Sequence, residues 1–210
     1  FNFLFRRMGW WTSNFVEAGG FSATKLGSPE YPDVQFHFTP IYRSHRGRKF
    51  EFGHGYSLFT CLLRPHSRGS VKLHKAGETH QVLIDHNFLS DSRDEVHIVE
   101  AIKKARELLS SQEFDSVRGD EIAPGKSIQS DEDLLEYIRH SALTVYHPVG
   151  TCKMGIDELA VVSPSDLKVK GMRNLRVIDA SIMPNIVSGN TSAPTMMIAE
   201  KGARMILDKV

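Results

Sequence analysis

The chain has 210 residues, of which 40% are hydrophobic and 24% are charged, a balance that excludes an intrinsically disordered protein. Its 26 basic and 25 acidic side chains leave a formal net charge of +1, which excludes a global field that draws a protein to nucleic acid or to an anionic membrane. Two cysteines, Cys61 and Cys152, are too few for a disulfide framework or a multi-cysteine zinc site, and no apolar run is long enough to span a membrane.

The first predicted elements are strands. Segment 1–32, which has an aromatic cluster and several glycines, predicts loop and short helix. In 33–39 apolar and polar residues alternate, which is typical of a half-buried strand. Ranges 56–63, 70–74 and 82–85 predict three further strands. Their turn-length connections favour an antiparallel sheet.

Helices are predicted after the strands. Ser92 and Glu95 form a capping-box pattern, and apolar residues at helical spacing behind it predict a helix of about five turns. Ser130 predicts the N-cap of a shorter helix, and Pro194 the start of a last one. Ranges 143–146 and 175–178 are β-prone. The elements together predict an α+β fold, in which an antiparallel sheet carries helices on one face and a C-terminal strand and helix belong to a different sheet.

One candidate for chemistry is His147, which lies between a β-prone stretch and a turn. Pro148 biases the backbone of His147 to an extended conformation, and Gly150 and Gly155 allow tight bends. An imidazole held in this way can take and return a proton at neutral pH. The alternative is a histidine that only caps a turn.

A second candidate is a strand-loop-helix arrangement near the C-terminus. The apolar stretch ends at Asp179-Ala180, and a polar loop continues through Asn190, Thr191 and Ser192 to the helix at Pro194. Backbone N–H groups at the start of a helix favour an anionic group, so this loop suits a cofactor. The alternative is a structural connection between strand and helix.

These two stretches resemble a known family. The residues His147-Pro-Val-Gly-Thr-Cys152 and Leu175-Arg-Val-Ile-Asp-Ala-Ser-Ile-Met-Pro184, followed by Asn190-Thr191 and Met196-Met-Ile-Ala-Glu200, are similar to the C-terminal signature of the glucose-methanol-choline (GMC) oxidoreductases. The resemblance is greatest to the choline dehydrogenase and bacterial alcohol dehydrogenase branch. It covers residues 64–207, and more loosely 1–63.

The resemblance implies a role for each site residue. His147 serves as the base, or helps the base, that takes the hydroxyl proton of an alcohol, and Asn190 hydrogen-bonds the substrate oxygen. FAD is the implied cofactor of this flavoprotein family. Asp179 and Ala180 are then expected near its pyrophosphate and ribityl chain, and Thr191 and Ser192 near the pyrimidine edge of the isoalloxazine. None of the ten histidines occurs in a zinc-binding pattern, so no metal site is expected.

The family's dinucleotide-binding fingerprint, G-x-G-x-x-G, does not occur in the chain. We therefore expect it upstream of Phe1, in a longer protein whose Rossmann-like FAD-binding domain is completed by the C-terminal strand and helix. Residues 1–63 are expected to end the N-terminal region and start the substrate-domain sheet. Residues 64–142 would form the substrate-binding domain, and 143–210 the catalytic loops and the end of the FAD domain. Such a fragment alone should be inactive and bind FAD weakly.

The implied function is that of an FAD-dependent alcohol dehydrogenase. It would oxidise a primary alcohol or choline-like substrate to the aldehyde, with hydride passing to flavin N5 and electrons to a quinone or another non-oxygen acceptor. Two alternatives stay open: an oxygen-using GMC alcohol oxidase, and a non-catalytic GMC remnant that acts as a binding module. No nucleic-acid partner is expected.

The expected compartment is the cytoplasm, since two cysteines fit a reducing environment. The basic run Arg43, Arg46, Arg48 and Lys49 predicts a solvated loop. Because the resembling branch passes electrons to a membrane quinone, peripheral contact with the inner face of the membrane through this run is the alternative.

Overall fold

The computed structural model describes residues 2–8, 12–42, 55–76 and 79–207. They form two compact units, each built from two separate stretches of the chain. The first unit comprises Phe1–Leu62 and Asp91–Leu143, and the second Leu63–Ser90 and Thr144–Val210. The functional division of the sequence at residues 63 and 142 stays a prediction. The basic run at 43–49 lies outside the described residues.

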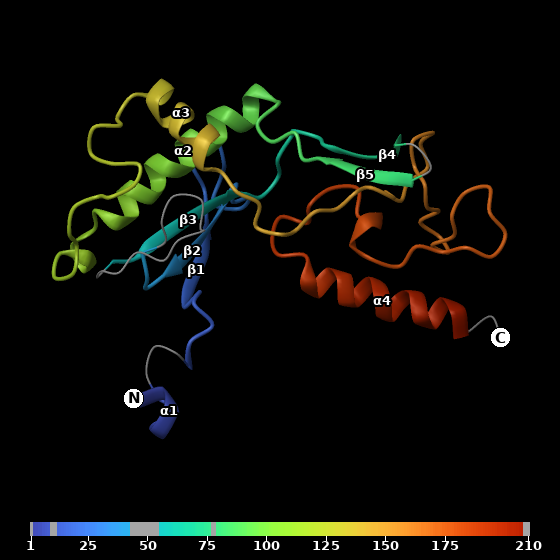
Figure 1. The fold of residues 1–210 in the computed structure, drawn as a ribbon, viewed down its shortest axis with the longest axis horizontal. Helices are drawn as coiled ribbons and strands as arrows, with labels where there is room; N and C mark the ends of the chain where they lie inside the picture. The colour runs from blue at the N-terminus through green and yellow to red at the C-terminus, as the bar shows by residue number, and fades with distance from the viewer. Residues whose placement is uncertain (1, 9–11, 43–54, 77–78, 208–210) are drawn as a thin grey trace. The chain divides into compact units, whose positions relative to one another are not determined.

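The first unit is a three-stranded antiparallel sheet covered by a helix (Figure 1). Its strands β1 (Ala18–Ser22), β2 (Val34–Thr39) and β3 (Ser57–Leu62) lie in the order β1-β2-β3. Helix α2 (Ser92–Leu109) packs on them, because its small residues face the apolar side of β2. The buried cluster consists of Val34, Phe36, Ala101 and Ala105. The alternation in 33–39 and the helical spacing after Ser92 thus identified the two elements that meet in this core.

Strand β1 was not predicted, since its sequence Ala-Gly-Gly-Phe-Ser has low strand propensity. Tertiary packing explains why it forms. A Cβ atom on Gly19 would lie 2.6 Å from the carbonyl oxygen of Phe36 on β2, so glycine permits the close approach of the two backbones. The expectation of only loop and short helix in 1–32 is therefore wrong at β1, although α1 (Asn2–Arg6) is a short helix.

Helices α2 and α3 (Asp131–Ser141) differ in how well their N-caps were predicted. Ser130 caps α3, and its side-chain oxygen accepts from the backbone N–H of Asp133 at 3.1 Å. The cap of α2 is Asp91 and not Ser92, because the Asp91 carboxylate accepts from the N–H of Arg93 at 3.0 Å. A short 3-10 turn, η2 (Gln112–Phe114), follows α2.

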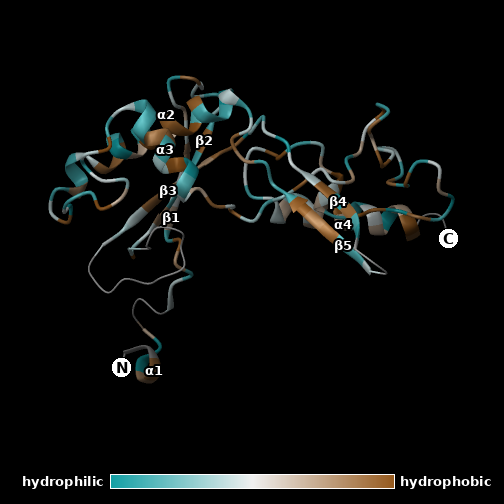
Figure 2. Cartoon of the chain, turned by 45° about the horizontal axis from the view of Figure 1, so that its top comes forward, coloured by the Kyte–Doolittle hydropathy of each residue, from teal (hydrophilic) through white to brown (hydrophobic). Residues whose placement is uncertain are grey.

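The second unit contains a hairpin and a long, mostly irregular segment. Strands β4 (Ser70–Ala76) and β5 (Thr79–Asp85) pair antiparallel, with Leu73 opposite Val82. Figure 2 shows the hydrophobic residues along this hairpin. The four predicted strands therefore exist, but β4 and β5 form a sheet separate from β1-β2-β3.

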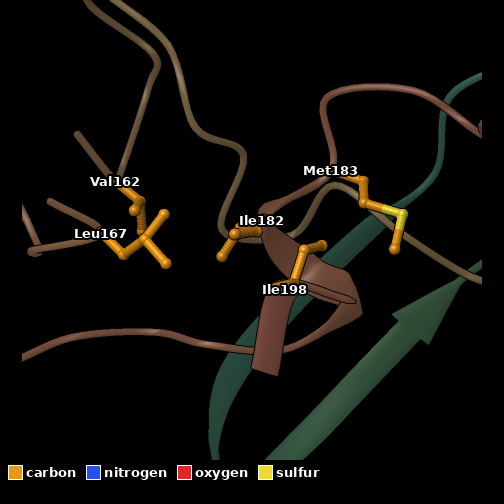
Figure 3. Packing of buried hydrophobic residues seen from close by; sticks show 5 residues of the cluster. All are labelled: Val162, Leu167, Ile182, Met183 and Ile198. Atoms are coloured by element: carbon orange, nitrogen blue, oxygen red, sulfur yellow. The ribbon is translucent and has the colours of Figure 1, made fainter. Parts of the chain in front are cut away.

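The irregular segment is organised by its own core. Val162, Leu167, Ile182, Met183 and Ile198 pack together, as Figure 3 shows. Ile182 belongs to the 3-10 turn η3 (Ala180–Ile182), and Ile198 to helix α4 (Ser192–Leu207). Helix α4 begins two residues before Pro194, which lies in its first turn as expected.

Two β-prone ranges do not form strands. In 143–146, Tyr146 has φ +64°, which is incompatible with an extended strand. In 175–178, Arg176 makes a single bridge with Lys168, and the N–H of Val177 donates to the carbonyl of Leu167 at 3.3 Å. The pairing partner is an irregular loop, so a ladder does not extend. The α+β class is nevertheless confirmed, with antiparallel sheets and separate helices. Among the described residues, no helix is long and apolar enough to cross a membrane.

Candidate active site

Two loops of the second unit lie side by side and hold His147. The N–H of Cys152 donates to the carbonyl of Ser181 at 3.1 Å, and that of Met154 to the carbonyl of Ile182 at 2.8 Å. These bonds attach the stretch that follows His147 to the η3 turn. Cys152 itself is half-buried and packs as a small apolar residue against the core formed by Val162, Leu167, Ile182, Met183 and Ile198.

Gly150 makes the bend between His147 and these bonds. Its φ of +89° lies in the region that L side chains rarely adopt, and a Cβ atom there would lie 3.4 Å from the carbonyl oxygen of Met183. The sequence predicted a tight bend at Gly150, and the backbone conformation of this bend requires glycine.

We expect Gly150→Ala to lower the free energy of unfolding by about 1–2 kcal/mol, because an alanine at positive φ is strained. Thermal unfolding of the protein measures the loss. Gly119→Ala is the matched control, since a Cβ atom at Gly119 meets no heavy atom within 4 Å. Equal melting temperatures for the two variants would contradict the assigned strain.

The His147 ring is hydrogen-bonded at both nitrogens. Its Nδ1 lies 2.9 Å from Oγ1 of Thr191, and its Nε2 lies 2.7 Å from Nδ2 of Asn190. Thr191 is buried, His147 is half-buried and Asn190 is exposed. The structure thus brings together three of the six predicted site residues, from loops more than 40 positions apart in the sequence.

The other three predicted site residues lie at other positions of the stretch 179–192. Asp179 caps η3, where its Oδ1 accepts from the N–H of Ser181 at 2.8 Å and from the Ser181 hydroxyl at 2.5 Å. Ala180 packs against the core of the irregular segment, shown in Figure 3. Ser192 is exposed and is the first residue of α4. Their predicted contacts with FAD remain predictions.

Two arginines that the sequence analysis did not single out hold the loop before Asn190. Nη1 of Arg64 donates to the Ser188 hydroxyl at 3.1 Å, and Nη2 of Arg68 donates to Oδ1 of Asn185 at 2.7 Å. Each pair is separated by more than 110 positions. The sequence shows only a polar turn at 64–69, and no local signal indicates such distant partners.

Among the described residues, no group of three or more His, Cys, Asp or Glu side chains is arranged to hold a metal ion. The His147–Asn190 contact places a nitrogen base beside an amide donor. This pairing suits a substrate oxygen that gives up a proton.

Comparisons with known proteins identify the family of the chain. A family model described as GMC oxidoreductase matches residues 65–199. The alcohol dehydrogenase [acceptor] of Pseudomonas putida is 47% identical over 212 residues, which cover 100% of this chain and 38% of that protein. The oxygen-dependent choline dehydrogenase of Staphylococcus aureus (strain Newman) is 41% identical over 205 residues, which cover 97% of this chain and 36% of that protein.

Solved structures share the fold. Pyridoxine 4-oxidase from Mesorbium loti superposes with a TM-score of 0.75 and 33% identity, covering 83% of this chain and 34% of that one. A fungal aryl-alcohol oxidase gives a TM-score of 0.70 and 32% identity, and the match covers 86% of this chain and 28% of that one. The chain thus spans well under half the length of the proteins it matches.

Proposed function

Because the chain belongs to the GMC oxidoreductase family, we propose that it acts as the C-terminal part of an FAD-dependent alcohol dehydrogenase. The substrate is a primary alcohol or a choline-like alcohol, and the product is the aldehyde. The names of the two relatives, an alcohol dehydrogenase and a choline dehydrogenase, support this substrate class.

The observation that supports the proposal best is the 2.7 Å contact between Nε2 of His147 and Nδ2 of Asn190. An alcohol hydroxyl is both a donor and an acceptor. It can therefore replace this contact by two hydrogen bonds, one donated to Nε2 and one accepted from Nδ2. The same oxygen is then held at the atom that takes its proton.

His147 and Asn190 have different tasks in the reaction. His147 takes the hydroxyl proton at Nε2, while the N–H of Asn190 stabilises the negative charge that develops on the oxygen. An amide does not take up a proton at physiological pH, so His147 is the base of the pair.

The N-terminus of α4 also offers a place for the pyrimidine edge of the flavin, which gains negative charge when the flavin is reduced. The helix is 16 residues long, and its first turn contains no acidic residue. Its first N–H groups and its positive dipole end favour a negative group. Thr191 and Ser192 would hold the pyrimidine edge of the isoalloxazine, and Asp179 and Ala180 the pyrophosphate and ribityl chain. When bound there, FAD would supply the acceptor for the hydride that leaves the alcohol carbon.

Mixing the FAD-containing enzyme with a primary alcohol or choline under anaerobic conditions tests the proposal. We expect bleaching of the oxidised flavin's visible absorbance and formation of one aldehyde per flavin. An enzyme that binds FAD but is not reduced by any alcohol of a broad panel would favour the non-catalytic binding module.

The electron acceptor in the proposal is a quinone or another non-oxygen acceptor, as the word "acceptor" in the name of the Pseudomonas putida relative suggests. An oxygen-using alcohol oxidase is the second candidate, favoured by the oxygen-dependent choline dehydrogenase and the pyridoxine 4-oxidase. Mixing the reduced enzyme with oxygen or with a soluble quinone separates the two. Fast reoxidation by oxygen with stoichiometric hydrogen peroxide would identify the oxidase.

The cytoplasm is the proposed compartment, because Cys61 and Cys152 are free thiols. Peripheral binding to anionic vesicles, lost in Arg46→Ser/Arg48→Ser/Lys49→Ser, would instead support the inner face of the membrane.

A further inference from the structure

Thr191 places a buried hydroxyl against the side of the His147 ring that is opposite Asn190. Its Oγ1 lies 2.9 Å from Nδ1, and Thr191 is only 6% exposed. Water therefore competes little for this hydrogen bond, and the hydroxyl is the close partner of Nδ1.

The contact at the other nitrogen decides which way the hydroxyl bond runs. The Nδ2 group of Asn190 can only donate, so Nε2 of His147 accepts. A neutral imidazole carries one ring proton, which must then be on Nδ1. Nδ1–H donates to Oγ1 of Thr191. The backbone nitrogen of Thr191 is also near Nδ1, but its 3.4 Å distance exceeds that of a normal N–H bond, so the 2.9 Å contact dominates.

The position of the Thr191 hydroxyl is fixed by the start of α4. The carbonyl of Thr191 accepts from the N–H of Thr195 at 3.0 Å and from its hydroxyl at 2.6 Å. Threonine is also branched at Cβ, which restricts its χ1 angle. A rigid acceptor therefore faces Nδ1 both when the ring is neutral and when it carries a second proton.

We propose that Thr191 is a positioning residue whose hydroxyl keeps the ring proton of His147 on Nδ1, so that Nε2 is the nitrogen that takes the alcohol's proton. The catalytic role that this inference gives to Thr191 rests on the proposed function. It assigns the Thr191 side chain to the histidine, whereas the sequence had suggested only a contact with the flavin.

Two substitutions at position 191 test the hydroxyl. Thr191→Val keeps the shape and the branch at Cβ but removes the acceptor, whereas Thr191→Ser keeps the acceptor. For the FAD-containing enzyme we expect Thr191→Val to slow flavin reduction at saturating alcohol about 10- to 100-fold, which is typical when a partner that orients a functional histidine is lost. The alcohol concentration for half-saturation should change less. Thr191→Ser should restore the rate to within about threefold.

A control in the first turn of α4 separates this role from support of the fold. Thr195→Val removes a hydroxyl one turn later, while the backbone N–H of Thr195 still bonds the Thr191 carbonyl. The rate of flavin reduction in Thr195→Val should fall by less than about threefold. The proposal would be overturned if Thr191→Val and Thr195→Val lowered the rate of flavin reduction equally and lost equal amounts of FAD.

The tautomer can be measured without turnover. In enzyme labelled with 15N-histidine, the two ring nitrogens of His147 are assigned by comparison with His147→Gln. We expect a protonated Nδ1 and an unprotonated Nε2 in the parent enzyme, and loss of this preference in Thr191→Val. A protonated Nε2 in the parent enzyme would overturn the inference even if alcohols reduce the flavin. The expected tautomer in an enzyme that no alcohol reduces would instead contradict the proposed function alone.

Discussion

Replacing His147 by alanine is expected to lower the rate of alcohol oxidation by about 10²- to 10⁴-fold while FAD remains bound, which is the usual contribution of a positioned general base. The ring is the only proton acceptor of the His147–Asn190 pair. Without it, the alcohol must lose its proton to water. The His147 loop should remain in place, because the bonds from Cys152 and Met154 to the η3 turn involve backbone atoms only.

Stopped-flow measurement of anaerobic flavin reduction in the FAD-containing enzyme gives this rate directly, and the flavin absorbance gives the FAD content. His140→Ala is the matched control, since His140 is exposed on α3 and its Nδ1 contacts the carbonyl of Glu136 in its own helix. It should reduce flavin at the parent rate. Unchanged reduction in His147→Ala would remove His147 from the mechanism.

The second large effect is expected at Asn190. Asn190→Asp has nearly the same shape but replaces the N–H donor by an acceptor, so the developing negative charge on the alcohol oxygen loses its partner. Loss of one such donor commonly lowers turnover by about 10²- to 10³-fold. The new carboxylate would also lie beside Nε2 of His147, where it favours a protonated ring and so weakens the base.

The same anaerobic assay measures this variant, with Asn174→Asp as the control that adds an equal charge in an exposed turn. Asn190→Ala separates the two effects, because it removes the donor without adding a charge. We expect Asn190→Ala to be faster than Asn190→Asp and slower than the parent enzyme. A parent-like rate for Asn190→Asp would show that the amide does not donate to the reacting oxygen.

Local patterns in the sequence were sufficient for several elements of the fold. The alternation in 33–39 and the helical spacing after Ser92 predicted β2 and α2, because one face of each is buried in a single core. The resemblance of the His147 and Asn190 motifs to the GMC family implied a base and a donor, and these two roles stay predictions.

The tertiary structure alone decided what depends on partners far away in the chain. Glycine-rich β1 forms only because Gly19 lets its backbone approach Phe36, and the β-prone range 175–178 stays irregular because an irregular loop faces it. In the site, the bond of Thr191 to Nδ1 and the contact of Asn190 with Nε2 join loops that are distant in sequence. The sequence by itself determined which side chains of the two loops carry groups that can bind a proton or donate a hydrogen bond. The fold decided which neighbour each nitrogen of His147 faces, because a neutral imidazole has two chemically similar nitrogens and only their neighbours distinguish them.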